Sequence, residues 1–512
     1  MMQTIGSMLD VTARNDPGRI AVYFEDQGLS YGDLNREVNK LANGLRSKGI
    51  GRGDRVMLFM KNSLMLVVGY FAVLKIGGTV VPLNVMFRGR EMSHIGTDTS
   101  ACAILADDDL WHGECSVRDV LPGLKHVFVH GEVQGSHEET VARIVSDNTE
   151  SPDVTGGLDD ITGILYTSGT TGQPKGATQT HRSILSNVMG CCTRNKFARE
   201  DRLLCALPLF NNFAINVVMM SAIASGATMV VVDRFDARKV LDQINRRKCT
   251  YFAGTPTMFA YLLREYDPGR DNVESLRVMN TGGAPCPPSL IEEVEQTFNT
   301  ILLDGYGQTE ACGFTTLNPL VGVRRANSVG VPISNIGVRI VSDDDLDLPV
   351  GEVGEIVEKG TPFSIHRYWN KPEINSEVYR GGWFHSGDLG YLDDDGYLYV
   401  VDRKQDLIIT GGANIYPAEI EGILCSHPKV SLAAVVGIPD EVKGELAKAF
   451  IVLRKGETAA EEEIIRFVRE RAAKYKAPRA VEFVESLPQG PTGKVLKREL
   501  RKPYWEGREA KI

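Results

Sequence analysis

The sequence predicts an α/β protein with a large N-terminal domain and a small C-terminal domain. Amphipathic helices alternate with short apolar runs as far as about residue 330, which is typical of parallel sheets covered by helices. A stretch of short β-prone runs follows (330–401), and helix–strand alternation returns after residue 402. A chain of 512 residues is long enough for about two to four domains.

The first part of the chain supports the prediction of parallel α/β subdomains. Ser30 and Asp33 form a helix start, apolar residues follow at helical spacing, and Gly49 can end the helix. Apolar runs between helical segments are predicted to be strands, at 55–60, 79–83, 101–105 and 126–130. Strands that alternate with helices in this way are expected to pair in parallel.

A charge-free run from Leu203 to Val232 is long enough to span a bilayer. Pro208, Asn212 and Gly226 interrupt it. We therefore predict a buried strand, loop, helix and strand rather than a transmembrane segment.

The second half of the chain changes character. Three short β-prone runs (337–341, 354–359 and 396–401) lie between Gly, Asp and Pro turns, which predicts a small β-barrel. Further along, Thr458 with Glu461 forms a capping-box pattern that predicts a helix as far as Tyr475, with Ile464 and Val468 on its buried face.

Charge and cysteine content restrict the class of protein. The net charge of −9 argues against a nucleic-acid partner. Residues 403–512 carry 20 Lys and Arg against 16 Asp and Glu, or +4, and the preceding 402 residues carry −13. Nine cysteines without a CxxC pair predict reduced thiols in a cytoplasmic protein. The first twenty residues do not form a signal peptide pattern.

The sharpest local feature is the string Tyr166 to Gly176, YTSGTTGQPKG, between a predicted strand (161–165) and a helix from about His181. Its three glycines let backbone N–H groups turn toward an anion. Four hydroxyls and Lys175 add donors and a positive charge. The loop is not a Walker loop, because Pro174 stands where the second glycine would fall. We predict that it binds the phosphates of a nucleotide.

This string resembles the signature of the adenylate-forming superfamily, which includes acyl- and aryl-CoA synthetases, luciferases and the adenylation domains of peptide synthetases. Further motifs follow in the family's order over essentially the whole chain, namely GYGQTE (305–310), GWFHSGD (382–388), DRKQD (402–406), GGANIYP (411–417) and PTGK (491–494). The resemblance implies activation of a carboxylic acid by ATP, with Mg²⁺, to an acyl-adenylate and pyrophosphate, and then transfer to coenzyme A.

The resemblance also implies roles for individual residues. Tyr306 would stack on adenine, Asp388 would bind the ribose diol with Arg403 as its partner, and Glu310 would bind Mg²⁺ beside Thr309 on the phosphate. The residues expected to contact ATP or AMP are Thr167, Ser168, Gly169, Thr170, Thr171, Gly172, Lys175, Gly283, Ala284, Pro285, Asp304, Gly305, Tyr306, Gly307, Asp388 and Arg403.

The resemblance divides the chain into a body (1–402) and a mobile lid (403–512). Lys494 would be the catalytic lysine, bridging the carboxylate and the α-phosphate, together with Glu310 and Thr309. Between the half-reactions the lid would rotate and bring Gly411 and Gly412 toward coenzyme A. Gln405 stands at the hinge, where relatives usually have Asp or Lys.

The acyl site is expected at 210–217, 254–259, 282–284 and 305–313, which are mostly apolar or small. Phe210, Asn211, Gly282 and Gly307 are its candidate residues, with Asn211 where CoA ligases often have His. Because Gly282, Gly305 and Gly307 leave room for a chain, a medium- or long-chain fatty acid is expected. An aryl acid such as a benzoate or cinnamate is the alternative.

Two other functions are compatible with these motifs. One is an adenylating enzyme with a carrier-protein thiol or oxygen as acceptor, and the other is a non-catalytic nucleotide-binding protein on the same scaffold. A dehydrogenase is disfavoured because no GxGxxG follows an early strand. A homodimer remains open.

Overall fold

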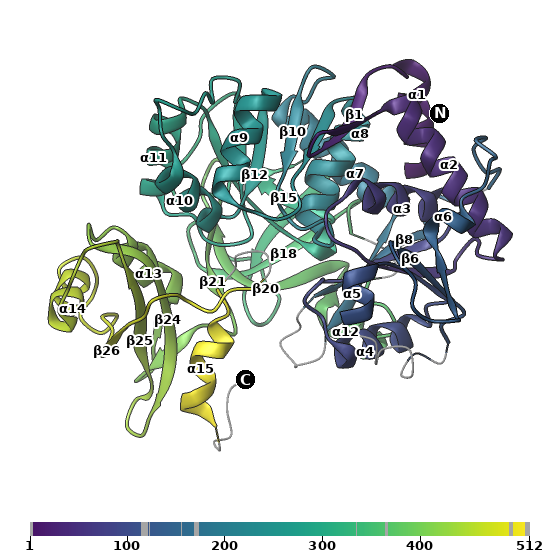
Figure 1. Cartoon of the computed structure of the whole chain (residues 1–512). Helices are drawn as coiled ribbons and strands as arrows, with labels where there is room; N and C mark the ends of the chain where they lie inside the picture. The colour runs from purple at the N-terminus through teal and green to yellow at the C-terminus, as the bar shows by residue number, and fades with distance from the viewer. Residues whose placement is uncertain are drawn as a thin grey trace.

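The computed structural model describes residues 4–113, 121, 123–154, 156–167, 174–333, 335–363, 367–490 and 495–506. It contains two large α/β sheets, a five-stranded antiparallel sheet and a C-terminal domain. The C-terminal domain, yellow in Figure 1, lies beside the rest of the molecule and approaches it near β20 and β21. The α/β class predicted from the sequence is confirmed.

The first large sheet has seven strands, all paired in parallel except the last pair, β8 with β9. Their order is β7 (Glu138–Thr140), β6 (His126–His130), β5 (Ala103–Asp107), β3 (Arg55–Phe59), β4 (Thr79–Pro82), β8 (Ile161–Thr167) and β9 (Lys175–Thr180). The strands predicted at 55–60, 79–83, 101–105 and 126–130 are therefore present, and they pair as expected.

The second large sheet has nine strands with a parallel centre and antiparallel edges. Their order is β16 (Val331–Pro332), β15 (Gly313–Leu317), β14 (Leu302–Gln308), β13 (Val278–Thr281), β12 (Tyr251–Gly254), β10 (Arg202–Cys205), β11 (Thr228–Val231), β1 (Ile20–Phe24) and β2 (Gln27–Ser30). The central strands are apolar on both faces, as parallel strands between helix layers require.

Alternate residues of each strand pack into different cores, since successive side chains point to opposite faces. Leu58 of β3 and Leu203 of β10 belong to the core between the two large sheets. Phe59 and Leu204 point to the opposite faces, where they are buried in the cores under the outer helices. Helices fill the central layer: α1 (Ile5–Asn15), α2 (Tyr31–Ser47), α3 (Leu64–Lys75), α7 (His181–Asn195) and α8 (Ser221–Ser225). Outer helices cover the other faces: α4 (Gly89–Thr99), α5 (Asp108–Gly113), α9 (Ala237–Arg247), α10 (Pro256–Glu265) and α11 (Pro288–Phe298).

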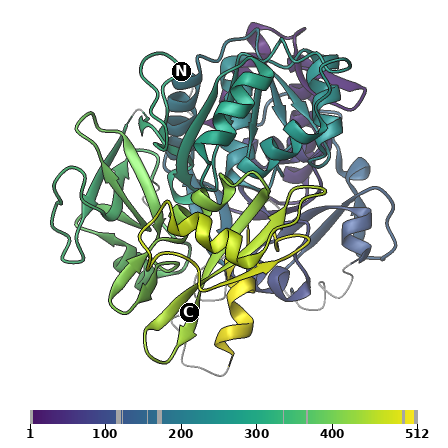
Figure 2. The ribbon, with the colours of Figure 1, turned by 90° about the vertical axis from the view of Figure 1, so that its left-hand side faces the viewer.

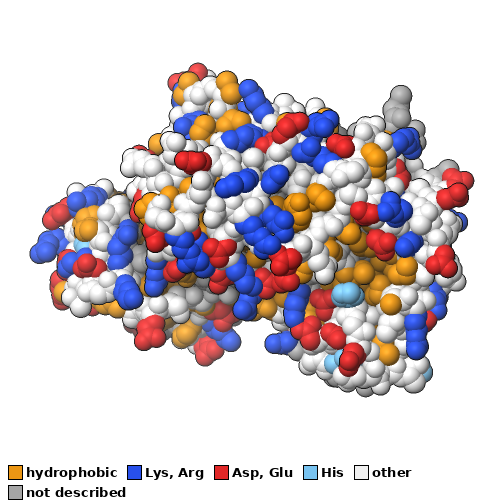
Figure 3. Space-filling model, turned by 45° about the horizontal axis from the view of Figure 1, so that its top comes forward, with side chains coloured by type: hydrophobic (Ala, Val, Ile, Leu, Met, Phe, Trp, Pro, Cys, Tyr) orange, Lys and Arg blue, Asp and Glu red, His pale blue; other side chains and the backbone are white. Residues whose placement is uncertain are grey.

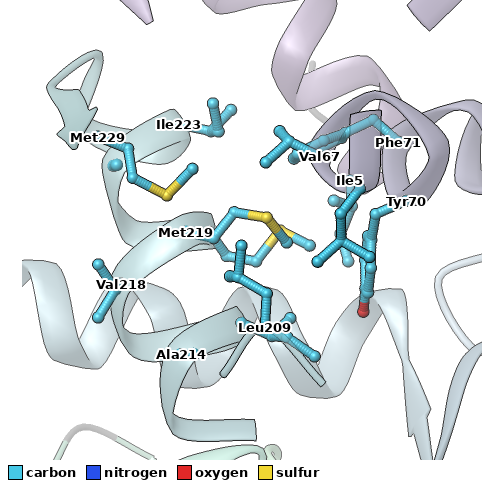
Figure 4. Packing of buried hydrophobic residues seen from close by; sticks show 14 of the residues in the cluster. Ile5, Val67, Tyr70, Phe71, Leu209, Ala214, Val218, Met219, Ile223 and Met229 are labelled. Atoms are coloured by element: carbon cyan, nitrogen blue, oxygen red, sulfur yellow. The ribbon is translucent and has the colours of Figure 1, made fainter. Parts of the chain in front are cut away.

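The charge-free run 203–232 forms β10, a π-helix η2 (Phe213–Met220) that continues into α8, and β11. Figure 4 shows Met219 of this run beside Leu209 and pointing toward Val67 and Tyr70 of α3, with Val218 on the other side of the run. The expected buried strand, loop, helix and strand is confirmed. Among the described residues, none of the helices has the length and apolar character needed to cross a membrane.

The third sheet is antiparallel throughout and carries one wall of the site described below. Its strands are β17 (Ile336–Val341), β18 (Gly354–Gly360), β20 (Trp383–Leu392), β19 (Tyr379–Arg380) and β21 (Leu398–Arg403). The expected barrel region is thus a five-stranded sheet. Three of its strands, β17, β18 and β21, lie close to the runs predicted at 337–341, 354–359 and 396–401, whereas β19 and β20 were not predicted. The short helix α12 (Pro372–Val378) packs beside β19 and β20, whereas α6 (Val141–Ile144) packs beside β6 and β7 of the seven-stranded sheet.

The C-terminal domain is α+β. Its strands are β22 (Ile408–Thr410), β23 (Ala413–Ile415), β24 (Val430–Asp440), β25 (Gly444–Leu453) and β26 (Ala480–Phe483), with helices α13 (Pro417–Cys425), α14 (Glu461–Arg469) and α15 (Lys497–Trp505). Figure 2 shows this domain in front of the body, with α15 beneath its sheet.

The predicted start and end of α14 are wrong. The helix is capped by Ala460 rather than Thr458, and it ends at Arg469 rather than Tyr475. The carboxylate of Glu461, which would complete a capping box, instead accepts a hydrogen bond from the Val481 backbone N–H at 2.8 Å. A tertiary contact therefore overrides the local capping pattern, although Ile464 and Val468 are buried as predicted.

Candidate active site

A cleft of about 3170 Å³ lies where the C-terminal domain meets the body. One wall follows the carboxyl ends of β12, β13 and β14, the edge at which open α/β sheets bind ligands. Thr255, the loop Gly283–Pro285 and the segment Asp304–Glu310 line this wall. The opposite wall comes from β20, β21 and the C-terminal domain. The cleft therefore brings together motifs that lie far apart in the sequence.

The predicted phosphate loop connects β8 to β9 in the sequence. Thr167 at the end of β8 and Lys175 at the start of β9 are register partners, and both line the cleft. The Lys175 ammonium lies 6.0 Å from the centre of the Tyr368 ring. Ser168, Gly169, Thr170, Thr171 and Gly172 lie outside the described residues. The flanking strand and the helix from His181, capped by the Thr180 hydroxyl, are as predicted.

Tyr306, Gln308, Asp388 and Arg403 meet in a polar cluster on the floor of the cleft. The Tyr306 hydroxyl donates to Asp388 Oδ2 at 2.7 Å. The Gln308 amide donates to the Tyr306 hydroxyl at 2.6 Å and to Asp388 Oδ2 at 3.1 Å. Arg403 is the β21 register partner of Asp388, and its Nε lies 3.6 Å from Asp388 Oδ1. The structure thus brings together three predicted residues and adds Gln308.

Glu310 is buried beside this cluster. Burial raises the pKa of its carboxyl group, and the Tyr368 hydroxyl, which donates to Oε1, counteracts this shift. Within the described part of the chain, its hydrogen-bond partner is a phenol rather than a cation. A buried carboxylate oxygen next to a cleft fits the preference of Mg²⁺ for oxygen ligands. Groups of three or more His, Cys, Asp or Glu residues that could hold a metal do not occur among the described residues.

Buried amides fix the segment that carries Thr309 and Glu310. Gln179 of β9 donates to the Thr309 carbonyl at 3.2 Å and to Asn212 Oδ1 at 2.8 Å. Asn216 donates to Asn212 Oδ1 at 2.7 Å and to the Cys312 carbonyl at 3.0 Å. Gln179 and Tyr368 were not predicted as site residues. Asn212 and Asn216 are polar residues inside an otherwise apolar run, and this pattern could have indicated a buried hydrogen-bond network.

The loop Gly283, Ala284, Pro285, for which adenine binding is predicted, lines the same cleft as Tyr306. Gly283 adopts a φ of +82°, which few other residues tolerate. Asp304 at the end of this wall is buried, and burial raises the pKa of its carboxyl group well above its ordinary value.

The acyl end of the cleft differs from the sequence-based picture. Phe213 and Phe314 pack edge to face with ring centres 5.3 Å apart. A Cβ built on Gly305 would lie 2.6 Å from the Phe314 ring, and one on Gly307 would lie 1.9 Å from the Gly313 carbonyl oxygen. The expectation that these glycines leave room for an extended chain is therefore wrong, because β15 already fills that space. Gly282 likewise lies against Phe314.

Phe210 and Asn211 both line the cleft. The Asn211 side chain, however, accepts a hydrogen bond from the Phe213 backbone N–H at 2.9 Å. This local turn positions Phe213 at the start of η2. Asn211 therefore holds the backbone that carries Phe213, and both residues line the cleft.

In the C-terminal domain, the segment that follows Lys494 and the turn at Gly411 and Gly412 lie in different environments. Lys494 lies outside the described residues, but Val495 and Leu496, which follow it, line the cleft. Gly411 and Gly412 form the exposed turn between β22 and β23, with open space around them. In this arrangement the segment after Lys494, rather than the glycine turn, borders the cleft.

The segment that joins the two domains is held on both sides. Lys404 lies 2.8 Å from Asp343 and 3.4 Å from Glu355 of the body. On the other side, Arg501 of α15 donates to the Gln405 carbonyl at 3.3 Å and pairs with Asp406 at 2.8 Å. Gln405 thus lies where contacts with the body give way to contacts with the C-terminal domain.

Comparison with known proteins identifies the family. The family model of AMP-binding enzymes matches residues 9–369, and that of their C-terminal domain matches residues 419–494. The chain is 36% identical to a feruloyl-CoA synthase of Amycolatopsis sp. over 98% of this chain and 99% of that protein. It is 35% identical to the long-chain-fatty-acid–CoA ligase FadD13 of Mycobacterium tuberculosis, with coverage of 98% and 99%.

A solved structure agrees with these matches. The crystal structure of the anthranilate CoA ligase AuaEII in complex with anthranoyl-AMP superposes with a TM-score of 0.92 at 27% identity, covering 98% of this chain and 97% of that one. The signature motifs, the layered fold and the relatives lead to the same assignment. The chain belongs to the AMP-binding enzyme family of the adenylate-forming superfamily, as an AMP-forming acid–CoA ligase.

Proposed function

We propose that the enzyme activates a compact aryl carboxylic acid, of the benzoate or cinnamate class, with ATP and transfers the acyl group to coenzyme A. Similarity alone leaves the acid open, since an aryl-acid and a fatty-acid ligase are nearly equally similar to this chain. The geometry of the acyl end favours the aryl acid over the fatty acid expected from the sequence.

The observation that carries this proposal is the Phe213–Phe314 pair. Both rings line the cleft, and the Phe314 ring occupies the space on the Cβ side of Gly282 and Gly305, so we expect it to limit the length of the acid. Phe314 is buried, and the Asn187 amide fixes its backbone by donating to the Phe314 carbonyl at 2.8 Å. An aromatic acid can pack edge to face against such rings.

The ATP site follows from the residues around the cleft. Under this proposal Asp388 accepts the ribose hydroxyls, with Arg403 beside it, and adenine lies between Tyr306 and the loop Gly283–Pro285. Lys175 and the glycine-rich loop bind the phosphates. The full proposed ATP set is the one predicted from the sequence, with Asp304, Gly305 and Gly307 supporting the adenine wall.

Glu310 would hold Mg²⁺ together with phosphate oxygens, and Thr309 would bind the phosphate. When bound, the metal ion supplies charge neutralisation to the phosphates. The residues of this chain orient the components. The Gln179–Asn212 amide pair holds the Thr309 backbone, and Tyr368 orients the Glu310 carboxylate.

Lys494 is proposed to bridge the substrate carboxylate and the α-phosphate during adenylation. The position of Val495 and Leu496 along the cleft supports this role, because Lys494 directly precedes them. The subsequent thioester step would require the C-terminal domain (403–512) to rotate about Gln405, so that Gly411 and Gly412 move from the exterior to the cleft.

A substrate panel tests the choice of acid. The panel contains benzoates, cinnamates and fatty acids of roughly six to sixteen carbons, which cover medium- and long-chain acids. Thioester formation is measured for each acid with ATP, Mg²⁺ and coenzyme A. We expect the highest kcat/KM for an aryl acid. Phe314→Ala should raise kcat/KM for longer acids and lower it for aryl acids. A wild-type preference for long-chain acids, unchanged in Phe314→Ala, would refute the proposed acid class.

The same assay distinguishes other acceptors. Pyrophosphate release is measured with and without coenzyme A, across the whole panel. An aryl-acid ligase should show faster release when coenzyme A is present, because the adenylate is then consumed. Release that coenzyme A does not affect would favour a different acceptor, and ATP binding without release would favour a non-catalytic protein.

A further inference from the structure

A buried carboxyl group, Glu358, lies behind the proposed ribose site. It stands on β18, is completely buried, and pairs in register with Val338 of β17 and Phe384 of β20. Its Oε2 accepts a hydrogen bond from the Thr315 hydroxyl at 3.2 Å. Its Oε1 has no hydrogen-bond partner among the described residues. An unsatisfied buried carboxyl oxygen is unusual in a folded protein and calls for an explanation.

The nearest explanation is the Tyr306 hydroxyl. Tyr306 packs against the same cluster as Val338, the register partner of Glu358. Burial and then the Asp388 charge raise the pKa of the Glu358 carboxyl, and the Tyr306 hydroxyl lowers it. The two carboxyl groups therefore flank one phenol. In this structure the phenol donates to Asp388 rather than to Glu358.

Asp388 cannot keep this arrangement when it binds a diol. A carboxylate oxygen offers about two acceptor positions, and those on Asp388 Oδ2 are taken by Tyr306 and Gln308. A ribose diol that places one hydroxyl on each carboxylate oxygen needs one of them. Tyr306 can release its bond by rotating only the hydroxyl hydrogen, whereas Gln308 must move its amide.

We propose that Glu358 is a positioning residue that accepts the Tyr306 hydroxyl when the ribose takes over Asp388. The hydroxyl hydrogen leaves Asp388 Oδ2 and turns to Glu358 Oε1, and a small shift of the side chains brings the two oxygens within hydrogen-bond distance. Gln308 then keeps its bonds to both Tyr306 and Asp388. The inference rests on the proposed binding of ribose by Asp388, and it assigns the exchange to a residue outside every signature motif.

The charge state of Glu358 is compatible with this role. Burial, followed by the Asp388 charge, raises the pKa of Glu358 to about 8, so the group is neutral at pH 7. A neutral carboxyl group retains a carbonyl oxygen that can accept a hydrogen bond. Glutamine carries the same carbonyl oxygen, and leucine has a similar volume without an acceptor.

A double-mutant cycle on ATP affinity tests the proposal. The dissociation constant of ATP is measured by calorimetry, without acid or coenzyme A, for wild type, Glu358→Leu, Glu358→Gln, Tyr306→Phe and the Glu358→Leu/Tyr306→Phe double variant. We expect Glu358→Leu to weaken ATP binding about tenfold, because the Tyr306 hydroxyl is left without an acceptor. Glu358→Gln should restore most of this loss. In the Tyr306→Phe background, Glu358→Leu should cost less than about twofold, because no hydroxyl remains to be satisfied.

Two controls make the result specific. Glu138→Gln changes a buried carboxyl group at the far edge of the seven-stranded sheet and should leave ATP affinity unchanged. Asp388→Asn tests the ribose assignment itself. If it binds ATP as well as wild type does, that assignment fails and the inference fails with it. If Asp388→Asn weakens binding but Glu358→Leu costs the same with and without the Tyr306 hydroxyl, only the role of Glu358 is overturned.

Discussion

At the scale of single residues, phenol–carboxylate pairs organise this site. Tyr306 donates to Asp388 and Tyr368 donates to Glu310. Each pair joins two strands or loops that are distant in the chain, so it orients a carboxylate that a local turn could not hold. A neutral donor leaves the carboxylate charge available, which suits groups that must receive a diol or a cation.

The ionisation of Glu358 predicts a pH-dependent difference in stability. Its pKa is raised from 4.5 to about 8 in the folded protein. Between these values the folded state holds a proton that the unfolded state has lost, so the free energy of unfolding falls as pH rises. Glutamine does not titrate. The melting temperature of Glu358→Gln, relative to wild type, should therefore increase from pH 5 to pH 8.

The control for this measurement is Asp201→Asn. Burial raises the pKa of Asp201, but hydrogen bonds from Arg277, Thr250 and the Ala198 backbone N–H outweigh it and hold the pKa below its ordinary value. Asp201 is therefore ionised in both the folded and the unfolded state between pH 5 and pH 8, and the difference of its variant from wild type should stay constant over this range. A Glu358→Gln difference that is equally constant over this range would show that Glu358 is not held neutral.

Sequence reasoning reached some of these residues and missed others for a physical reason. Asp388 and Arg403 were expected together, because their motifs are distinctive, and they are register partners. Tyr368, Gln179 and Glu358 lie in ordinary strings, and the site residues that they contact are more than thirty residues away. A contact that depends on how separate strands meet leaves no local pattern in the sequence.

At the scale of elements, α3 shows how a polar group can stabilise an apolar helix. Lys75 ends this helix with only 2% of its side chain exposed. Its ammonium donates to Asp10, Asn35 and Asn39 at 2.5–2.7 Å. The cluster joins α3 to α1 and α2, which together fill the central layer of the body.

Removal of this ammonium should be strongly destabilising. Lys75→Met leaves three acceptors without their donor, and we expect it to lower the free energy of unfolding by about 3 kcal/mol. Lys40→Met, which removes an exposed pair with Glu37, should cost less than about 1 kcal/mol. Urea unfolding of both variants gives the comparison. Equal costs would show that the buried cluster contributes no more than a surface pair.

The elements also show where local patterns are reliable. The strands β3, β4, β5, β6 and β8 and the helix after Thr180 follow from hydrophobic spacing and caps, which act within a few residues. The start of α14 was misplaced because Val481 recruits the Glu461 carboxylate. The prediction that glycines leave room for a long acyl chain fails for a similar reason. The sequence alone does not reveal that Phe314 of the neighbouring strand fills the space beside Gly305.

The segment between the domains gives a prediction about an element that must move. Gln405→Pro fixes one backbone dihedral at the proposed hinge. It should slow thioester formation more than adenylation, because only the thioester step requires rotation. Gln405→Ala keeps the backbone freedom and serves as the control. The two half-reactions are measured separately by rapid quench, and equal slowing of both by Gln405→Pro would place the hinge elsewhere.

At the scale of the whole molecule, the charge distribution agrees with different roles for the body and the C-terminal domain. Positive and negative side chains are interspersed over the face shown in Figure 3, as expected for a protein whose net charge is only modest for its length. The excess of positive charge in residues 403–512 suits a domain that alternates between the phosphates of ATP and those of coenzyme A. Under our proposal the body binds the substrates and the small domain contributes groups in turn.

Lys494 tests this division. Lys494→Ala should slow acyl-adenylate formation by about a hundredfold or more, because one charge-stabilising group is lost from the transition state. Thioester formation from supplied acyl-adenylate should be affected much less. Lys474→Ala, in the same domain but after α14, should change neither rate. Equal loss in both half-reactions would exclude the proposed role for Lys494.

The central claim is that this protein makes an aryl-adenylate and passes the aryl group to coenzyme A. The most direct measurement mixes the enzyme with ATP, Mg²⁺ and the preferred aryl acid, quenches the mixture and identifies the product by mass spectrometry. We predict enzyme-bound aryl-AMP with one pyrophosphate released for each adenylate, and its conversion to aryl-CoA and AMP when coenzyme A is added. Formation of ADP, or the absence of an adenylate with any aryl acid, would contradict the account.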